Sequence, residues 1–511
     1  MLAKLKSLGL VGIEGFELTI EVDLGNGLPK FDIVGLPDAA LKESKERIHS
    51  AIRNSGLHFP KGHTTVNMAP ADKKKEGPMY DLPIALAVLM AMGDIQPEAL
   101  KDTAIFGELS LDGSVRKVNG VLPLLITARN AGYKKVILPK VNENEASFIN
   151  GLEMYGVEDV KQAVDFLNNR VQLQPITCRD FAEMKSKIES NDDFCYIRGQ
   201  STAKRAMEIA AAGGHNIIMM GPPGAGKSML AKCMPGILPD LTFDEALEVT
   251  KIHSIAGVLD NKVGIVYTRP FRTPHHTTTP IALTGGGLKA KPGEISLAHN
   301  GVLFLDELPE YSRKALEVLR QPLEDGKITV ARVHATIDYP AEFMMIASMN
   351  PCPCGHYGSK SHICKCTPAA IHKYLDKLSG PLMDRIDLHI EVDGVSFDQL
   401  RANDALEETS ASVKERVNKA REIQTKRFEG TNVRCNAKMP TKMVNKYCKI
   451  DDETQTLLKE AFDKLHMTAR SHNRILKVAR TIADLEGSEN ILMEHVAEAI
   501  GYRSLDKKYW V

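Results

Sequence analysis

The sequence predicts an α/β fold class with several domains. A phosphate-binding loop pattern, G-x-x-x-x-G-K-[ST], occupies residues 221–228 between an apolar strand-like run and a helix-like run. Strand-like and helix-like runs also alternate through the first 170 residues, and the chain from about residue 411 has helical periodicity. The 511 residues suffice for three or four domains of ~150 residues each. We therefore expect an N-terminal α+β domain, a phosphate-loop α/β core and a C-terminal helical domain.

The composition limits the classes of function. The chain is 43% hydrophobic, which is enough for large cores. Lys plus Arg and Asp plus Glu both number 65, so binding to nucleic acid would need local basic patches. No apolar run approaches the ~20 residues of a membrane span, and the N-terminus lacks the apolar core of a signal peptide. The nine cysteines are not spaced as a disulfide framework, and we expect a cytoplasmic protein.

Residues 1–170 are expected to form the first domain, followed by a polar linker over 171–194. Apolar alternation predicts strands, and helical periodicity predicts helices between them. The expected strands are 16–22 and 64–68, and the expected helices are 41–54 and 81–92.

Three segments of this first domain, 67–72, 75–78 and 107–113, resemble the proteolytic domain of Lon-type proteases. That family uses a Ser–Lys dyad. The corresponding positions here are Met79 and Leu122, whose side chains are neither nucleophile nor base. The resemblance implies a Lon-like α+β fold without the dyad, and a protein that is not a protease.

The phosphate-binding loop predicts a nucleotide site. Its glycines let backbone N–H groups face an anion at a helix N-terminus. Lys227 is expected to reach the β- and γ-phosphates, and the Ser228 hydroxyl to bind Mg²⁺. A glycine-rich turn before an ordinary helix is the alternative. The expected nucleotide-binding residues are Gly221, Pro222, Pro223, Gly224, Ala225, Gly226, Lys227 and Ser228.

Two later strands are expected to bring catalytic groups to this loop. Residues 299–307 form an apolar run that ends in Asp306 and Glu307. We expect Asp306 to bind Mg²⁺ and Glu307 to polarise the attacking water, with a solvated acidic turn as the alternative. A second apolar run, 343–350, ends in Asn350, which is expected to help place that water.

Several segments resemble AAA+ ATPases. The Ile197-Arg198-Gly199-Gln200 segment resembles the I-x-G-Q segment that lines the adenine pocket of that family, which implies nucleotide contacts from Ile197, Gly199 and Gln200. The segment 380–387 resembles the one that carries the arginine finger, so Arg385 is implied to reach the site of a neighbouring subunit in a ring.

The segment that begins at residue 468 resembles the second sensor of AAA+ ATPases. This implies contact between Arg470 and nucleotide phosphate, with Arg474, one turn along, as the alternative. For each predicted catalytic arginine, an ordinary surface salt bridge is the competing interpretation.

Two insertions mark the AAA+ branch that includes magnesium chelatase motor subunits and the MCM helicases. The first, about 253–294, carries Arg269 and Arg272, and the second, 327–337, has the alternation of a β-hairpin. Arg332 in this hairpin is expected to contact DNA backbone, with an ordinary exposed arginine on a β-turn as the alternative. Arg269 and Arg272 are expected beside it, or else as braces of the fold.

Four of the cysteines cluster in a short segment of the expected ATPase core. Two C-x-C pairs supply Cys352, Cys354, Cys364 and Cys366, with two histidines between them. Four thiolates are typical of a tetrahedral zinc site, which we prefer to a mixed Cys/His site or an iron–sulfur cluster. The cluster directly follows Asn350, so zinc is expected to brace that strand.

The remaining chain is expected to be helical. We place the ATPase core at 195–395 and a helical lid domain at 396–511. Residues 413–428 carry many Lys and Arg residues, which indicates a solvated helix face or, alternatively, a stripe that faces DNA.

Together these segments resemble the YifB/ComM family of magnesium chelatase-like proteins over nearly the whole chain. The resemblance implies an ATP-driven, hexameric DNA motor with helicase or branch-migration activity in recombination during natural transformation. The implied cofactors are ATP, Mg²⁺ and Zn²⁺, and the implied partners are single-stranded or branched DNA and recombination proteins. A chelatase-type motor that acts through a partner protein, or a nucleotide-dependent binding module, are the alternatives.

Overall fold

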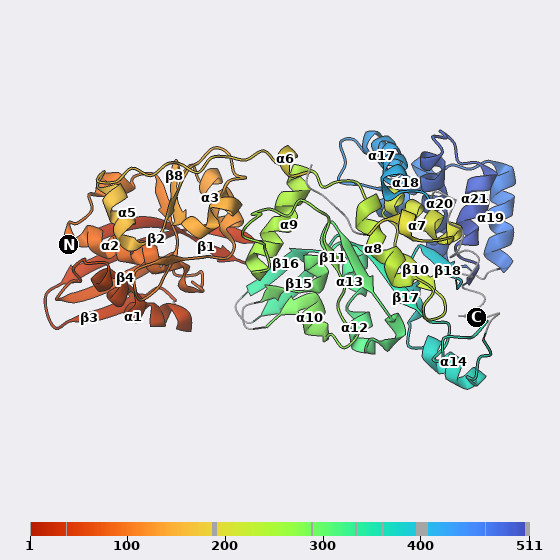
Figure 1. The fold of residues 1–511 in the computed structure, drawn as a ribbon, viewed down its shortest axis with the longest axis horizontal. Helices are drawn as coiled ribbons and strands as arrows, with labels where there is room; N and C mark the ends of the chain where they lie inside the picture. Colours follow the sequence, from red (N-terminus) through yellow and green to blue (C-terminus); the bar gives the residue numbers. More distant parts are fainter. Residues whose placement is uncertain are drawn as a thin grey trace. The chain divides into compact units, whose positions relative to one another are not determined.

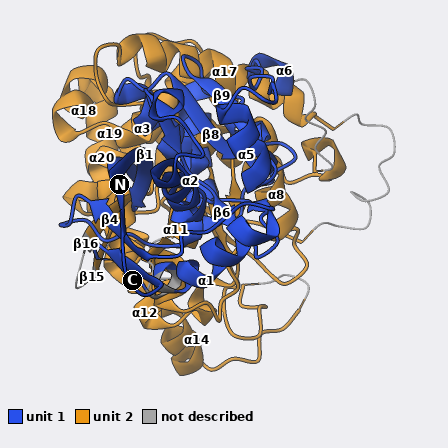
Figure 2. Ribbon diagram, turned by 90° about the vertical axis from the view of Figure 1, so that its left-hand side faces the viewer, with its two compact units in different colours: residues 1–187, 242–267 blue, residues 188–241, 268–511 orange. Residues whose placement is uncertain are grey.

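The structure is a computed structural model that describes residues 2–36, 38–185, 192–287, 290–332, 335–358, 362–394, 407–464 and 467–505. The chain forms two compact units (Figure 2). Unit 1 comprises residues 1–187 and 242–267, and unit 2 comprises 188–241 and 268–511.

Unit 1 is built on a seven-stranded mixed sheet in the order β3-β4-β2-β1-β5-β8-β9. The pairs β1–β2 and β2–β4 are antiparallel, whereas β1–β5, β5–β8 and β8–β9 are parallel. The strands of this sheet are β1 (Leu2–Val11), β2 (Glu14–Gly25), β3 (Lys30–Val34), β4 (His63–Ala69), β5 (Thr103–Ile105), β8 (Lys135–Pro139) and β9 (Glu153–Val157). The short strands β6 (Glu108–Leu109) and β7 (Val115–Arg116) pair with each other.

The helices of unit 1 cover this sheet. Helix α2 packs against β1 and β2 and also contacts α1 and α5, which explains why its sequence is apolar on every face. The predicted strands and helices of this domain are confirmed. The helices are α1 (Ala39–Asn54), α2 (Asp81–Met92), α3 (Val121–Asn130), α4 (Glu143–Ala146), α5 (Val160–Leu167), α6 (Ala182–Lys185) and α9 (Phe243–Ala256).

The two positions that the resemblance to Lon-type proteases assigns to a Ser–Lys dyad lie in the apolar core of unit 1. Met79 belongs to a short 3₁₀ turn, Pro78–Tyr80, and Leu122 lies in the first turn of α3. Both side chains are buried among hydrophobic neighbours. The structure therefore places packing side chains at both positions.

One segment departs from the predicted domain limits. Residues 242–267, which we assigned to the ATPase core, pack within unit 1. The Ser254 hydroxyl on α9 donates to Glu145 Oε1 at 2.5 Å and accepts from the Gly120 N–H at 2.8 Å. Burial raises the pKa of Glu145. The position of this helix in the sequence, next to the helix that follows the phosphate loop, contains no information about its packing partner.

Unit 2 contains a five-stranded parallel sheet in the order β11-β14-β17-β10-β18. Its strands are β10 (Ile217–Met220), β11 (Phe271–Arg272), β14 (Val302–Leu305), β17 (Met344–Met349) and β18 (Leu388–Glu391). The short strands β12 (Gly285–Gly286) and β13 (Lys291–Pro292) pair with each other. The predicted α/β fold class, with a parallel sheet and a helical C-terminal region, is confirmed (Figure 1).

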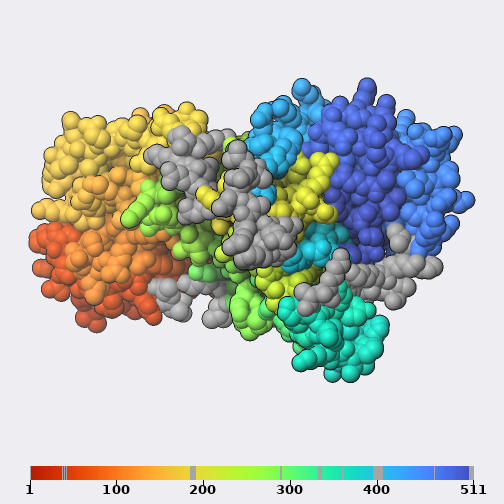
Figure 3. All heavy atoms as spheres, turned by 45° about the vertical axis from the view of Figure 1, so that its right-hand side comes forward, coloured from red at the N-terminus to blue at the C-terminus, as the bar shows by residue number. Residues whose placement is uncertain are grey.

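Helices surround the unit 2 sheet. The C-terminal helices α17 and α20 both contact α7, and the yellow surface of α7 abuts their blue surface in Figure 3. The helices are α7 (Ser201–Gly213), α8 (Lys227–Ile237), α10 (Pro280–Thr284), α11 (Glu294–Leu297), α12 (Arg313–Glu317), α13 (Arg320–Asp325), α14 (Pro368–Leu375), α15 (Gly380–Met383), α17 (Ser410–Arg427), α18 (Thr441–Tyr447), α19 (Asp452–Lys464), α20 (Ala469–Leu485) and α21 (Met493–Gly501).

The predicted hairpin is present in unit 2. Strands β15 (Lys327–Arg332) and β16 (Ala335–Pro340) pair in antiparallel register from Lys327↔Pro340 to Arg332↔Ala335. The side chain of Arg332 and residues 333–334 lie outside the described part of the chain. Among the described residues, no helix has both the length and the apolar character needed to cross a bilayer.

Candidate active site

The strand order of unit 2 brings three predicted groups to one edge of the sheet. Strand β10 leads into the phosphate-binding loop, β14 leads into the two acids, and β17 lies between them and leads into Asn350. Because all three strands are parallel, their carboxyl ends meet at the same edge, where ligands of open α/β sheets bind. Asn350 is therefore placed between the loop and the acids.

The backbone of the loop fits a phosphate chain. Gly224 and Gly226 have φ values of 78° and 87°, a region that favours glycine. A Cβ on Gly221 would lie 2.1 Å from the Val392 carbonyl oxygen, so no side chain fits there. Helix α8 begins directly at Lys227 and presents its unpaired N–H groups to the loop.

Lys227 is a buried cation at the centre of this site. Its side chain donates to the carbonyls of Gly221 at 2.7 Å and Pro222 at 2.9 Å, and to Asn350 Oδ1 at 3.3 Å. Burial lowers the pKa of Lys227, and the nearby charges of Asp306 and Glu307 partly oppose this. These partners are neutral oxygens, which leaves the ammonium suited to an anionic ligand such as a nucleotide phosphate.

Asp306 and Ser228 form the predicted magnesium pair. The Ser228 hydroxyl donates to Asp306 Oδ2 at 2.9 Å. Two neighbouring oxygens of an octahedral Mg²⁺ shell lie about 3.0 Å apart when each is ~2.1 Å from the ion. The two oxygens therefore fit adjacent positions around one Mg²⁺ ion.

Ser348 is a participant that the sequence analysis missed. Its hydroxyl donates to Asp306 Oδ1, and it lies 3.4 Å from the backbone nitrogen of Glu307. It orients, from the neighbouring strand, the carboxylate that is predicted to bind Mg²⁺. A single polar residue in the otherwise apolar strand β17 was the available signal.

Glu307 has a left-handed backbone conformation and an accessible carboxylate. It adopts a φ of 51°, and its side chain is 54% exposed. His276 Nδ1 lies 3.7 Å from Glu307 Oε2. A half-exposed carboxylate beside the phosphate loop can orient a water molecule.

Arg385 is buried, whereas Arg470 is accessible. The Arg385 side chain is 6% exposed, donates to the Pro381 carbonyl at 2.5 Å and forms an ion pair with Glu324. Arg470 is 61% exposed and lies 3.5 Å from the same carboxylate. The roles of both arginines stay predictions.

The alternative second sensor, Arg474, is engaged elsewhere. It pairs with Asp387 Oδ1 at 2.9 Å, and His215 Nδ1 lies 3.2 Å from Asp387 Oδ2. Burial opposes ionisation of Asp387, but Arg474 and His215 outweigh it and hold its pKa well below the usual range. Of the two candidates for the second sensor, Arg470 therefore has the side chain that is more accessible to a nucleotide phosphate.

The predicted adenine-pocket segment forms a turn before α7. Ile197 is buried, and Gly199 and Gln200 have φ values of 63° and 59°. The Gly199 N–H donates to Glu407 Oε1 at 2.9 Å, which ties this turn to the C-terminal region. Adenine binding by this segment stays a prediction.

The arginines of the first insertion brace the fold. Arg269 donates to the carbonyls of Pro239 and Asn300 at 2.5 and 2.7 Å. Arg272 makes a two-pronged ion pair with Glu294 at 2.7 and 2.8 Å. These contacts favour the bracing alternative over DNA binding for both residues.

The cysteine cluster has the geometry of a metal site. The four sulfurs of Cys352, Cys354, Cys364 and Cys366 all lie within 4.8 Å of one another. Three of the pairs are separated by 3.4, 3.6 and 3.7 Å. Sulfurs at ~2.3 Å from a tetrahedral zinc ion are about 3.8 Å apart. The residues present therefore fit Zn²⁺.

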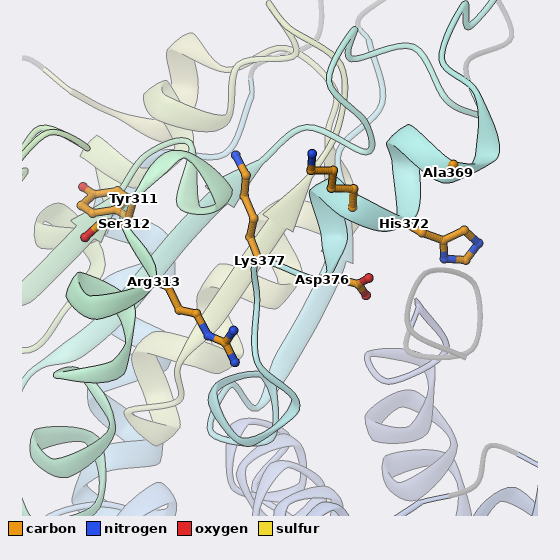
Figure 4. Close-up of a pocket in the computed structure, with 8 residues that line it drawn as sticks. Tyr311, Ser312, Arg313, Ala369, His372, Asp376 and Lys377 are labelled. Carbon is orange, nitrogen blue, oxygen red and sulfur yellow. The ribbon is translucent and has the colours of Figure 1, made fainter.

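A separate pocket of about 700 Å³ is lined by residues that follow the acids and by α14 (Figure 4). It contains the basic side chains Arg313, Lys373 and Lys377 together with Asp376. None of the predicted nucleotide ligands lines it. It is therefore distinct from the phosphate loop.

Comparisons with known proteins agree with this architecture. The family models described as "Subunit ChlI of Mg-chelatase", "Magnesium chelatase, subunit ChlI" and "Magnesium chelatase, subunit ChlI C-terminal" match residues 20–142, 193–400 and 407–503.

Two curated relatives are similar along the whole chain. Competence protein ComM of Haemophilus influenzae is 43% identical over 508 residues, which cover 99% of this chain and 98% of the relative. YifB of Escherichia coli is 41% identical, with 97% and 96% covered. DNA repair protein RadA of Aquifex aeolicus is 37% identical over 102 residues only, 20% of this chain and 22% of RadA. The matching family models imply ATP and Mg²⁺ as cofactors. The chain belongs to the YifB/ComM family of magnesium chelatase-like AAA+ ATPases.

Proposed function

We propose that this protein is an ATP-driven, hexameric DNA motor with helicase or branch-migration activity, acting in cytoplasmic recombination during natural transformation. The observation that carries the proposal is the complete cluster around Lys227, Ser228, Asp306 and Glu307, which is suited to hydrolysis. The full-length relative named as a competence protein supports the setting, and the partial similarity to a DNA repair protein supports DNA as the partner.

The residues of this chain divide the catalytic work. Lys227 would bind the phosphates, Ser228 and Asp306 would hold Mg²⁺, and Glu307 would orient water. Bound Mg²⁺ supplies charge neutralisation at the transferring phosphoryl group. Asn350, hydrogen-bonded to Lys227, would fix the position of the ammonium relative to that water.

The deciding experiment measures ATP hydrolysis with single-stranded, duplex and four-way-junction DNA. We expect stimulation by at least one of these, weakening steeply with salt because the contacts are to phosphates. A rate of ATP hydrolysis that none of the three DNAs changes would contradict the motor proposal. It would favour the alternative of a chelatase-type motor acting through a partner protein, which the three chelatase family models support.

The hairpin β15–β16 is proposed as the grip on DNA, through Arg332. One cation per subunit can hold a backbone phosphate without reading sequence. Arg332→Ala should keep basal ATPase and lose DNA stimulation and strand displacement. Lys327→Ala is the matched control, because Lys327 lies on the same strand and pairs with Asp338 at 3.0 Å. Equal losses in both variants would exclude a specific role for Arg332.

Arg385 is proposed as the arginine finger that acts on a neighbouring subunit. Arg385→Ala and Lys227→Ala should each abolish hydrolysis alone. Mixed rings should recover part of the activity, because some sites then combine an intact loop with an intact finger. Normal hydrolysis by Arg385→Ala alone would disprove the assignment.

We also propose one zinc ion per chain at the cysteine cluster. The sulfur separations fit four thiolate ligands, and Cys352 lies two residues after Asn350, so metal would brace the end of β17. Elemental analysis should give one zinc per chain, and a strong chelator should lower the melting temperature. Metal-free protein with unchanged thermal stability would exclude a structural zinc site.

A further inference from the structure

One carboxylate joins the two predicted catalytic arginines. Glu324, on α13, forms an ion pair with Arg385, and its Oε1 lies 3.5 Å from an Nη atom of Arg470. The hydrogen bond from Arg385 lowers the pKa of Glu324, burial opposes this, and the charges of Arg385 and Arg470 add to the lowering. Glu324 itself is exposed, so water can replace either partner.

Arg385 is incompletely satisfied in this arrangement. Its Nη1 donates to the Pro381 carbonyl, but its Nε is buried without a hydrogen-bond partner among the described residues. A buried polar group without a partner costs stability, so the Glu324 ion pair is the principal charged contact that keeps the guanidinium in place. Loss of that contact would leave Arg385 with one backbone acceptor.

Glu324 also lies at the base of the hairpin. Helix α13 ends at Asp325, Gly326 follows with a φ of 65°, and β15 begins at Lys327. The Ala341 N–H, just after β16, donates to the Gly326 carbonyl at 2.8 Å, which closes the base of the hairpin. Only two residues therefore separate Glu324 from the proposed DNA-gripping element, and displacement of the hairpin would move this carboxylate.

We propose that Glu324 is a positioning residue that restrains Arg385 and Arg470 until the hairpin moves. The proposal rests on the proposed motor function, because it takes Arg385 to act on a neighbouring subunit's nucleotide. A carboxylate and a phosphate compete for the same guanidinium. With Glu324 in place, Arg385 is held by its own subunit. Displacement of the hairpin by DNA withdraws the carboxylate and frees both arginines for phosphate.

The test compares Glu324→Gln with wild type in assembled protein. This change keeps the shape of the side chain and removes its charge. We expect basal ATPase without DNA to rise about fivefold or more, the lower end of typical coupling between sites, while the rate at saturating DNA stays near wild type. The ratio of DNA-stimulated to basal rate should therefore fall. Adding Arg385→Ala to Glu324→Gln should abolish the increase.

Glu317→Gln is the matched control, because Glu317 is exposed on the preceding helix and pairs locally with Arg320. It should leave both rates unchanged. A Glu324→Gln variant with wild-type or reduced basal ATPase, or one that only melts earlier, overturns the proposal. Failure of the motor proposal is distinguishable, since wild-type ATPase would then ignore DNA whatever Glu324→Gln does to the basal rate.

Discussion

Glu307→Gln should slow ATP hydrolysis without changing the stability of the fold. The Glu307 side chain is about half exposed, and its Oε2 lies 3.7 Å from His276 Nδ1. Glutamine has the same shape, so the free energy of unfolding should change by no more than about 0.5 kcal/mol. Nucleotide binding should persist, because the contacts of Lys227 and of the Ser228–Asp306 pair are untouched.

Hydrolysis should respond very differently. A carboxylate that accepts a proton from the attacking water contributes about 10²–10⁴-fold. At 1.36 kcal/mol per tenfold change, this corresponds to about 2.7–5.4 kcal/mol in the activation barrier. A single-turnover assay of phosphate release measures the rate of hydrolysis. ATP affinity and melting temperature, measured on the same preparation, report nucleotide binding and stability separately.

Glu310→Gln is the control for this experiment. Glu310 is exposed, lies three residues further on and pairs with Lys377 at 3.4 Å. Its replacement should leave hydrolysis within about twofold of wild type, since it does not reach the loop. If Glu307→Gln hydrolyses ATP as fast as Glu310→Gln, then Glu307 does not orient the water and the catalytic assignment is wrong.

Three further predictions concern other parts of the chain. Gly221→Ala should abolish ATP binding, measured by titration with a fluorescent nucleotide, because a Cβ would collide with the Val392 carbonyl at 2.1 Å. Asp387→Asn should destabilise unit 2 by about 3 kcal/mol in chemical denaturation, because the partly buried Arg474 loses its ion-pair partner. Since the pKa of Asp387 is lowered in the folded state, its contribution should be full above pH ~4 and lost as the pH falls further. With a core methionine at position 79, the purified protein should not cleave casein with ATP.

Local motifs predicted which residues meet at the carboxyl edge of the unit 2 sheet, for a physical reason. The phosphate loop needs glycines and a lysine at fixed spacing, and this spacing is visible in the sequence. Apolar strands that end in Asp306 and Asn350 also predict where their polar ends will meet, because parallel strands present the same edge. Ser348 was missed because a single serine in a strand carries no local signal of its partner.

Long-range packing decided the properties that the motifs could not. Arg385 was predicted from its segment alone, and the tertiary structure buries it against Glu324, a residue 61 positions earlier in the chain. Arg269 and Arg272 suggested a basic surface, but their guanidinium groups bind backbone carbonyls and Glu294. Charge is a property of the residue, whereas its availability depends on which acceptors the fold brings within reach.

The sequence by itself determined the fold class, the helices and strands tested above, the phosphate loop with its acids, and the four cysteines that lie together. Each depends on periodicity or spacing within a short segment, which local chain geometry sets. Only the tertiary structure decided that α9 packs in unit 1, that Ser348 orients Asp306, and that Glu324 joins two arginines. These contacts join residues distant in sequence, and the free energy that selects them comes from packing and desolvation of the whole unit.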